Sequence, residues 1–526
     1  MVITSIQFAL FVLGSLVLFM VFPKKIKWIS LLISSLLFYA LADLRCLGFV
    51  LFSSGSVWCA AKCIHNNFEQ ENRKLEICQD KSDRREIKNV SKKKRKRILK
   101  ITLFLNIGIL ILLKICKFMG VSFPVLEMMN GRSDVLNILM PLGISYYTFS
   151  VTGYLLDVYW KRYAYEPNFF RFLTWTVYFP HIVQGPIARY GQSGMELKKQ
   201  LSLKWNNFKF GTELILWGMF KKLVIADRIS VFINTAYSEN YFLEIGIVSF
   251  LALVLDAVQI YTDFSGYMDI VTGVSEIFGV KLEKNFNHPF FARTVPEFWR
   301  RWHMSLGSWF KDYVYYPVSV SGFCKKVSKK LKGKCSDKVL SIILTAIPVM
   351  CTWILTGLWH GTGAGYLAWG IYYGTLIILS VTFSGKIQEF WKRLSVNTEN
   401  FSFRFFQHIK IFFIFMGGRF LGNTIGFHTR MVMIKSIFTD FTHGKFWNSV
   451  VYQMGVNQFN FLILIVSICI LILVSVMQEK CPVRKVYERQ NYLFKVVILC
   501  IAFYVVFLFG IYGPEYDVGN FMYQQF

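Results

Sequence analysis

The sequence predicts an all-α, multi-pass membrane protein with about 11 or 12 spans, accompanied by re-entrant or interfacial helices. The chain of 526 residues is 54% hydrophobic. Its mean hydropathy of +0.42 is too high for an ordinary soluble protein. Apolar stretches long enough to cross a bilayer recur along the chain. No hydrophilic stretch is long enough for a separate soluble domain, so we expect residues 1–526 to form one membrane domain.

The apolar stretches divide this domain into an N-terminal part (1–120), a central part (138–384) and a C-terminal part (405–526). The candidate spans are 3–22, 28–42, 46–63, 99–119, 138–158, 210–233, 245–279, 339–358, 363–384, 405–427, 459–477 and 493–512. The stretch 245–279 is long, and we expect it to form two segments. Two further stretches, 172–188 and 297–318, are apolar but broken, which is typical of re-entrant or interfacial segments.

Short basic segments between the spans set the expected orientation. The formal net charge is +28, and the basic residues gather in 65–100, 321–338, 385–396 and 479–495. Basic loops stay on the cytoplasmic side, which places both termini outside the cytoplasm and the protein in the cell membrane. A charge of this size can also indicate nucleic-acid binding, but its position beside apolar spans argues against that partner.

His360 is the most informative single residue. It follows Trp359 within "PVMCTWILTGLWHGTGAGYLAWGIYYGTLIIL", a stretch apolar enough to span a bilayer. An ionisable side chain at membrane depth is costly, so it faces protein or a water-filled cavity and marks a candidate functional site. Glycines around it would let a backbone or a ligand approach closely. The alternative is that His360 only anchors a helix end at the membrane interface.

A second Trp-His pair, Trp302 and His303, lies in "PEFWRRWHMSLGSWFKDYVYYP", residues 296–317. On one continuous helix, this segment would have three faces. They are an aromatic face of Trp302, Leu306, Trp309 and Tyr313, a polar face of Arg301, Ser305, Ser308 and Asp312, and a third face of Arg300, His303, Gly307 and Lys311. Each charge exposed to lipid near the bilayer centre costs at least ~2.5–3.5 kcal/mol. The segment therefore lies at the interface, as an amphipathic helix with Trp anchors, or lines a polar interior.

A polar stripe also runs through the apolar stretch 251–273. Asp256, Gln259, Asp263 and Tyr267 share one helical face. Such a stripe faces a lumen or pairs with buried arginines, and structural pairing is favoured over direct catalysis by these carboxylates.

The sequence favours neither a metal site nor a nucleotide site. Its 11 cysteines are scattered, mostly within apolar spans, and none forms a CxxC pair. Cys59 and Cys63 have no matching pair to complete a zinc site. Neither a G-x-S-x-G motif nor a Walker loop is present. We therefore expect neither a metal nor a bound cofactor.

Taken in order, several motifs resemble the membrane-bound O-acyltransferase family, in its bacterial branch of alginate O-acetyltransferase-like and D-alanyl-lipoteichoic-acid transfer proteins. The motifs are "MPLGISYYTFSVTGYLLDVYW" (140–160), "FPHIVQGPIARY" (179–190), "GMFKKLVIADRI" (218–229), "FSGYMDIVTGVSEIFGVKLEKNFNHPFFA" (264–292), "FWRRWHMSLGSWFKDYVYYPV" (298–318), "LTGLWHGTGAGYLAWGIYYG" (355–374) and "NFMYQQF" (520–526). One motif alone would be a weak signal, whereas several in order are specific.

The resemblance implies a ring of helices around a tunnel that crosses the membrane, with residues 138–384 as the catalytic core. An acyl thioester, acetyl-CoA or an acyl-carrier protein, would enter from the cytoplasm, and an acceptor hydroxyl from outside. The family's principal histidine falls at His360, as general base, and its other histidine at His303, on the donor side. Residues expected to line the tunnel are Trp302, Trp359, Arg300, Arg301, Asp263, Asp256, Gln259, Lys311 and Asp312.

The acceptor implied by the resemblance is a cell-surface polysaccharide or peptidoglycan. An extracytoplasmic partner protein, of the SGNH or alginate-acetylation type, is also implied. The length of the chain favours O-acetyl transfer over the alternative, D-alanyl transfer from a carrier protein toward lipoteichoic acid. Direct transfer and a covalent acyl intermediate are both open. A transporter or channel that uses the same buried histidines is a further alternative, which the paired Trp-His motifs and the absence of internal repeats disfavour.

Overall fold

The computed structural model describes residues 2–119, 141–238, 240–361, 363–422, 426–440 and 456–512. The motif at 520–526, the start of the expected span at 138–158 and the predicted position of the C-terminus lie outside these residues. The described chain is helical, and its one β-bridge joins Lys332 to Cys335. It divides into two compact units, Met1–Gly211 with Val271–Glu283, and Thr212–Ile270 with Lys284–Phe526.

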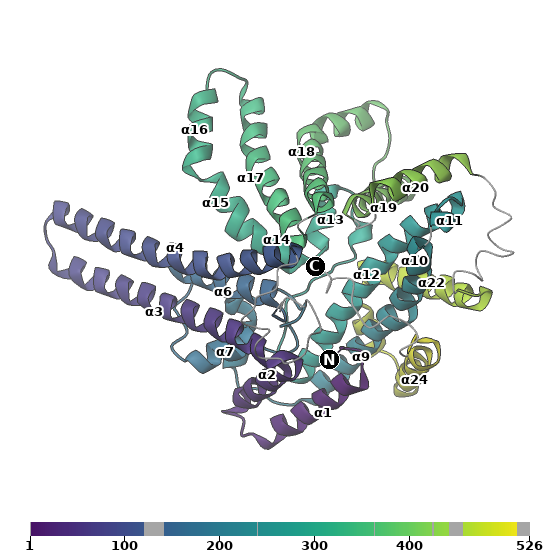
Figure 1. Ribbon diagram of the computed structural model, residues 1–526, viewed down its shortest axis with the longest axis horizontal. Helices are drawn as coiled ribbons and strands as arrows, with labels where there is room; N and C mark the ends of the chain where they lie inside the picture. Colours follow the sequence, from purple (N-terminus) through teal and green to yellow (C-terminus); the bar gives the residue numbers. More distant parts are fainter. Residues whose placement is uncertain are drawn as a thin grey trace. The chain divides into compact units, whose positions relative to one another are not determined.

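The first unit contains the N-terminal helices. They are α1 (Ile6–Val21), α2 (Lys27–Asp43), α3 (Leu47–Ile77), α4 (Lys81–Met119), α6 (Ile144–Tyr159), α7 (Phe169–Val177) and α8 (Met195–Lys198). Helices α3 and α4 form a long antiparallel hairpin (Figure 1). The basic segment 65–100 was expected to be a loop, but nearly all of it is helical within this hairpin. Lys, Arg and Glu are good helix formers, and Arg95 forms a buried ion pair with Glu71 across the hairpin.

The second unit contains the candidate site. Its helices are α10 (Asp227–Ser238), α11 (Asn240–Leu243), α13 (Val295–Arg301), α14 (Met304–Phe310), α15 (Tyr316–Ser319), α16 (Gly322–Leu331), α17 (Asp337–His360), α18 (Ala364–Arg393), α19 (Phe401–Gly422), α20 (Phe427–Thr439), α22 (Gln458–Lys480), α23 (Val483–Glu488) and α24 (Tyr492–Phe509). Two more helices, α9 (Trp205–Met219) and α12 (Gly246–Ile277), have most of their length in it.

Seven helices of the described chain are long and apolar enough to cross a membrane, and two more are apolar but shorter, so the protein is a multi-pass membrane protein. The seven cover Leu44–Ile77, Lys81–Cys116, Gly246–Ile277, Asp337–His360, Ala364–Arg393, Gln458–Lys480 and Tyr492–Phe509. This number is smaller than the 11 or 12 spans expected. One reason is that the helix over 210–233 contains a π-helical part at Phe220–Ala226, and the α-helical parts on either side, α9 and α10, are each too short to count as a span.

Two further expectations need correction. The stretch 245–279, expected to form two segments, is the single helix α12. The segment 296–317, treated above as one helix, is instead interrupted between α13 and α14, whereas α14 continues through a π-helical part at Lys311–Tyr315 into α15. The interruption falls at Trp302 and His303, because the backbone of His303 has φ 45° and ψ 53°, in the left-handed region that no right-handed helix continues through.

Helices α17 and α18 lie side by side (Figure 1), and glycines allow their backbones to touch. A Cβ atom at Gly357 would lie 2.4 Å from the backbone oxygen of Tyr366, and one at Gly370 would lie 2.5 Å from that of Trp353. Either contact is too short for a real side chain, so the two helix backbones touch where both residues are glycine. This contact positions the C-terminal end of α17, which carries His360.

Candidate functional site

His303 occupies the turn between α13 and α14. Its left-handed backbone costs about 1–3 kcal/mol for a residue other than glycine, so the surrounding structure must hold it there. The extended segment 285–287 does so from both sides. The backbone N–H of Met304 donates to the backbone oxygen of Asn285 at 2.9 Å, and that of Asn287 donates to Arg301, also at 2.9 Å.

The side chain of Asn285 continues this contact to the imidazole. Its Oδ1 atom lies 3.2 Å from Nδ1 of His303 and accepts hydrogen bonds from the backbone N–H of Ser305 at 3.0 Å and from Oγ of Ser305 at 2.9 Å. Phe264 packs edge-on against the ring, 4.9 Å between centroids. His303 is only 3% exposed, and this burial lowers the pKa of its imidazole to about 3. The ring is therefore neutral near pH 7.

His360 lies at the C-terminal end of α17 and is buried among indole rings. The centroid of its imidazole is 4.7 Å from Trp359 and 5.0 Å from Trp369 of α18. Trp359 also lies 6.2 Å from the ring of His303. One tryptophan thus lies beside both histidines, which come from segments 57 positions apart in the sequence.

Both histidines line the same cavity, which has a volume of about 550 Å³. One wall is a single face of α17, formed by Val349, Thr352, Trp353, Thr356 and His360. Val349 and His360 are eleven positions apart on the helix, so this wall is about 16 Å long. Arg300 and Lys311 also line the cavity and are solvent-exposed, so they lie at its opening.

A second, much smaller cavity of about 30 Å³ adjoins His360. That volume is close to the space that one water molecule occupies in the liquid. Trp299, Trp302, Trp369 and His360 line both cavities, and the small one is completed by residues that include Tyr366 and Arg419. His360 is therefore the ionisable side chain shared by the two cavity walls.

The residues predicted to line a tunnel divide into two groups. Trp302, Arg300, Lys311 and His303 line the 550 Å³ cavity with His360, and Trp359 lies beside both histidines. Arg301, Asp312, Asp256, Asp263 and Gln259 line neither cavity. Arg301 instead pairs with Glu297 at 2.9 Å and with Glu479 at 2.6 Å.

The carboxylates of α12 have structural partners. Asp256 receives two hydrogen bonds from Arg419, both at 2.9 Å. Asp263 pairs at 2.7 Å with Lys222, which also pairs with Asp227 at 2.7 Å. All these charged groups are buried or nearly so. Buried pairing of this kind satisfies the charges of an apolar helix, which is the structural reading of the polar stripe.

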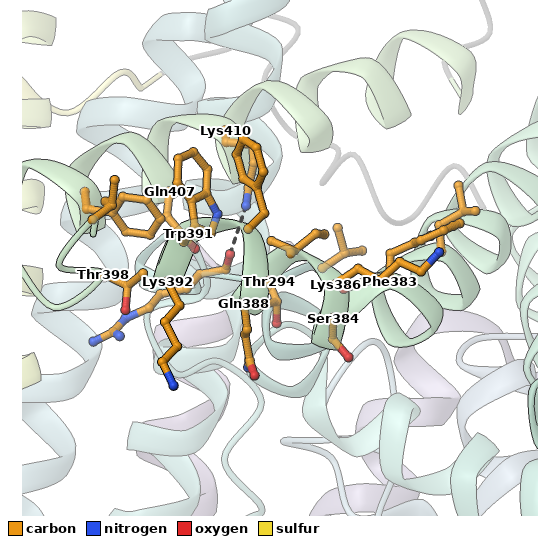
Figure 2. A pocket seen from close by; sticks show the side chains of 18 of the residues that line it. Thr294, Phe383, Ser384, Lys386, Gln388, Trp391, Lys392, Thr398, Gln407 and Lys410 are labelled. Atoms are coloured by element: carbon orange, nitrogen blue, oxygen red, sulfur yellow. Dashed lines mark hydrogen bonds between the residues drawn. The ribbon is translucent and has the colours of Figure 1, made fainter. Parts of the chain in front are cut away.

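A larger cavity lies apart from the histidines, between the second half of α18 and the first half of α19. Figure 2 shows its labelled side chains, which include Lys386, Lys392 and Lys410 beside Phe383 and Trp391. Its volume is about 1150 Å³. Nζ of Lys410 donates to the backbone oxygen of Arg293 at 3.3 Å. Size alone therefore does not identify the candidate site, because neither histidine lines this larger cavity.

Sequence reasoning missed several residues of the site. Asn285, Trp299 and Trp369 contact the histidines or line their cavity, and none was singled out. Asn285 and Trp369 lie inside motifs that were noted for their resemblance, and Trp299 lies three residues before Trp302. The missing signal was the break at His303, which brings Asn285 to the ring.

Comparison with known proteins agrees with the motifs. Residues 93–331 match the model of the membrane-bound O-acyltransferase family. That range includes His303, whereas His360 follows it.

The chain is also similar to three kinds of relative. A probable alginate O-acetylase of Pseudomonas aeruginosa is 32% identical over 242 residues, 45% of this chain and 42% of the relative. The peptidoglycan O-acetyltransferase of Helicobacter pylori is 25% identical over 314 residues, 55% and 56% of the two chains. The teichoic acid D-alanyltransferase of Bacillus subtilis is 28% identical over 269 residues, 49% and 64%. The chain spans about half the length of most relatives that it matches. Over residues 93–331 the chain is therefore similar to the membrane-bound O-acyltransferase family.

Proposed function

We propose that this protein is a membrane-embedded O-acyltransferase that passes an acyl group, in first place acetyl, from a cytoplasmic thioester to a hydroxyl of a cell-surface glycan. One observation carries the proposal. Two histidines from distant segments line one cavity, and the second of them also borders a smaller cavity. A transfer between two substrates that arrive from different directions needs such a meeting point.

The chemistry follows from the properties of a buried imidazole. The acceptor hydroxyl oxygen attacks the thioester carbonyl carbon, and His360 takes the hydroxyl proton as general base. The carbon–sulfur bond then breaks, and the departing thiolate receives a proton from the protonated histidine. Atoms and charge balance without a metal or a redox cofactor. His303 acts on the donor side, in the part of the cavity that Arg300 and Lys311 open toward solvent.

The donor is an acyl thioester, either acetyl-CoA or an acyl-carrier protein. Its phosphate groups are anionic, and Arg300 and Lys311 supply positive charge at the opening of the cavity. By the positive-inside bias, the basic segments face the cytoplasm, and both termini lie outside it in the cell membrane. An extracytoplasmic partner of the SGNH or alginate-acetylation type would then carry or orient the polymer.

The similar proteins differ in the acyl group and in the polymer that their names give. The alginate O-acetylase and the peptidoglycan O-acetyltransferase favour acetyl transfer to a polysaccharide or to peptidoglycan. The similarity to a teichoic acid D-alanyltransferase supports D-alanyl transfer as the second candidate. The two differ in the acyl group, so the product separates them.

The test is product analysis of cell-envelope polymers by mass spectrometry, in cells with and without the protein. We expect acetyl esters that require the protein and that disappear in a His360→Ala variant. Esters of D-alanine would instead support the second candidate. The control is His428→Ala, because His428 is an exposed histidine on α20. Full acetylation by membranes that contain His360→Ala would refute the proposed base.

A further inference from the structure

The contact between Asn285 and His303 fixes where the proton of the imidazole lies. We propose that Asn285 is a positioning residue that holds neutral His303 in the tautomer protonated at Nδ1, so that Nε2 is a proton or hydrogen-bond acceptor during acyl transfer. This inference deepens the function proposed above. The role of Nε2 during acyl transfer rests on that proposed function, whereas the tautomer of His303 does not.

The first step is the orientation of the asparagine amide. The atom of Asn285 that faces Ser305 lies 3.0 Å from a backbone N–H, which can only donate. If the NH₂ group of Asn285 lay there instead, two donors would face each other, the amide NH₂ and the backbone N–H of Ser305, and no hydrogen bond could form. The facing atom is therefore the carbonyl oxygen Oδ1, and the orientation follows from the hydrogen-bond network. The Oγ of Ser305, at 2.9 Å, satisfies the same assignment as a donor.

The second step transfers this constraint to the imidazole. Oδ1 of Asn285 can only accept, so Nδ1 of His303 at 3.2 Å from it must carry a hydrogen. A neutral imidazole has one hydrogen on its two nitrogens, and the burial that lowers the pKa of His303 keeps it neutral. Nε2, on the other edge of the ring, therefore carries a lone pair. In the resting state it can accept a hydrogen and cannot donate one.

The third step concerns how firmly the arrangement is held. The backbone oxygen of Asn285 accepts from Met304, directly after His303, so the same residue holds both the backbone and the ring of the turn. Asn285 is only 3% exposed, and the Nδ2 atom of its side chain lies 3.2 Å from the sulfur of Met268. A hydrogen bond to the remote nitrogen of a functional histidine is the usual way in which proteins select its tautomer.

The direct test is the tautomer itself. In protein labelled with ¹⁵N-histidine, solid-state NMR distinguishes protonated from unprotonated ring nitrogens, and the His303 signals are those lost in His303→Gln. We expect Nδ1 to be protonated and Nε2 not. The opposite assignment would overturn the proposal, whatever the activity of the protein. Because this measurement needs no substrate, it stays valid even where the acyltransferase activity proposed above fails.

The functional test compares two replacements of Asn285. Asn285→Leu has similar size and no acceptor, so we expect at least a tenfold loss of kcat. Asn285→Asp keeps an oxygen that accepts from Nδ1–H, and its negative charge raises the pKa of His303. A higher pKa means that His303 is protonated, and inactive, up to a higher pH. The acid limb of the pH–rate profile should therefore move to higher pH, with activity recovered at alkaline pH.

The other ionisable side chains that line the cavity with His303 are Arg300, Lys311, Tyr315, Tyr316 and His360. None of them is changed in Asn285→Asp, so a shift of the acid limb relative to the wild type reports His303. The matched control is Asn234→Ala, because Asn234 is an exposed asparagine on α10 that lines neither cavity. It should keep the wild-type profile. Wild-type kcat in folded Asn285→Leu, or an unmoved acid limb in Asn285→Asp, would contradict the role assigned to Asn285.

Discussion

The two histidines of the site are held in different ways. His303 is held by hydrogen bonds, from the backbone of segment 285–287 and from the side chain of Asn285. His360 is packed against the rings of Trp359 and Trp369. It lies at the end of α17, which contacts α18 closely through Gly357 and Gly370. Packing fixes where a ring lies, whereas a hydrogen bond to an atom that can only accept also fixes which nitrogen carries the proton. The hydrogen bond to Asn285 therefore sets both the position and the tautomer of His303, whereas packing against the two indole rings sets only the position of His360.

The largest effects are expected when the histidines themselves are replaced. His360→Ala and His303→Ala should each lower kcat by about 10²-fold to 10⁴-fold, the usual contribution of a positioned acid or base, with the larger loss at His360. The double variant should lose little more than His360→Ala alone, because residues that act as a unit are not additive. The measurement is kcat in proteoliposomes. Normal activity of His303→Ala would identify His303 as the interfacial anchor of the alternative reading.

The next effect concerns the packing that positions His360. In Gly357→Val, the Cβ atom alone would lie 2.4 Å from the backbone oxygen of Tyr366 on α18, and two methyl groups are added to it. Overpacking against backbone should cost at least about 3 kcal/mol of stability, at the upper end of the usual range. We expect a lower unfolding temperature in detergent and loss of activity.

Gly363→Ala is the matched control for this steric effect. A Cβ at Gly363 would meet only a ring carbon of Tyr366 at 3.9 Å, an ordinary contact. Its unfolding temperature should stay near that of the wild type. Equal destabilisation by the two substitutions would mean that backbone contact between α17 and α18 is not the cause.

The smallest effects come from two neighbouring arginines beside His303. Arg300 lines the cavity with the histidines, whereas Arg301 pairs with Glu297 and Glu479 outside it. Arg300→Gln should raise KM for the thioester donor by about 2-fold to 5-fold at low salt with kcat unchanged, because an exposed ionic contact contributes at most ~1 kcal/mol.

Arg301→Gln should leave KM and kcat within about 2-fold of the wild type, since partly exposed ion pairs contribute little. Initial rates over a range of donor concentrations measure both variants. The reverse order, with Arg301 affecting KM and Arg300 not, would mean that the cavity described here is not where the donor enters.

The sequence predicted the helical membrane class and most of the helices, because hydropathy over about 20 residues depends on the chain alone. It did not predict that α12 is one helix. The length of that stretch suggested two segments, and the partners of its carboxylates could not be read locally, because Asp256 pairs with Arg419 and Asp263 with Lys222, which lie 163 and 41 positions away. Pairing at such a distance along the chain leaves no local pattern.

From the sequence, the two histidines of the candidate site could be found, but the helix break at one of them could not. Both histidines stood out because an ionisable group beside Trp in an apolar stretch is unusual. The helix break at His303 has no proline or glycine beside it, so no local signal marks the end of α13. Arg300 and Lys311, which were placed on one helical face with His303, line one cavity with it.

The left-handed backbone of His303 has a consequence for which replacements the position tolerates. Asparagine, like histidine, occurs in that region more often than other residues with a side chain, and glycine enters it freely, whereas alanine and leucine do not. A saturation library at position 303 should therefore yield two separate rankings. Protein abundance should favour glycine and asparagine, which keep the turn, while activity should favour histidine alone.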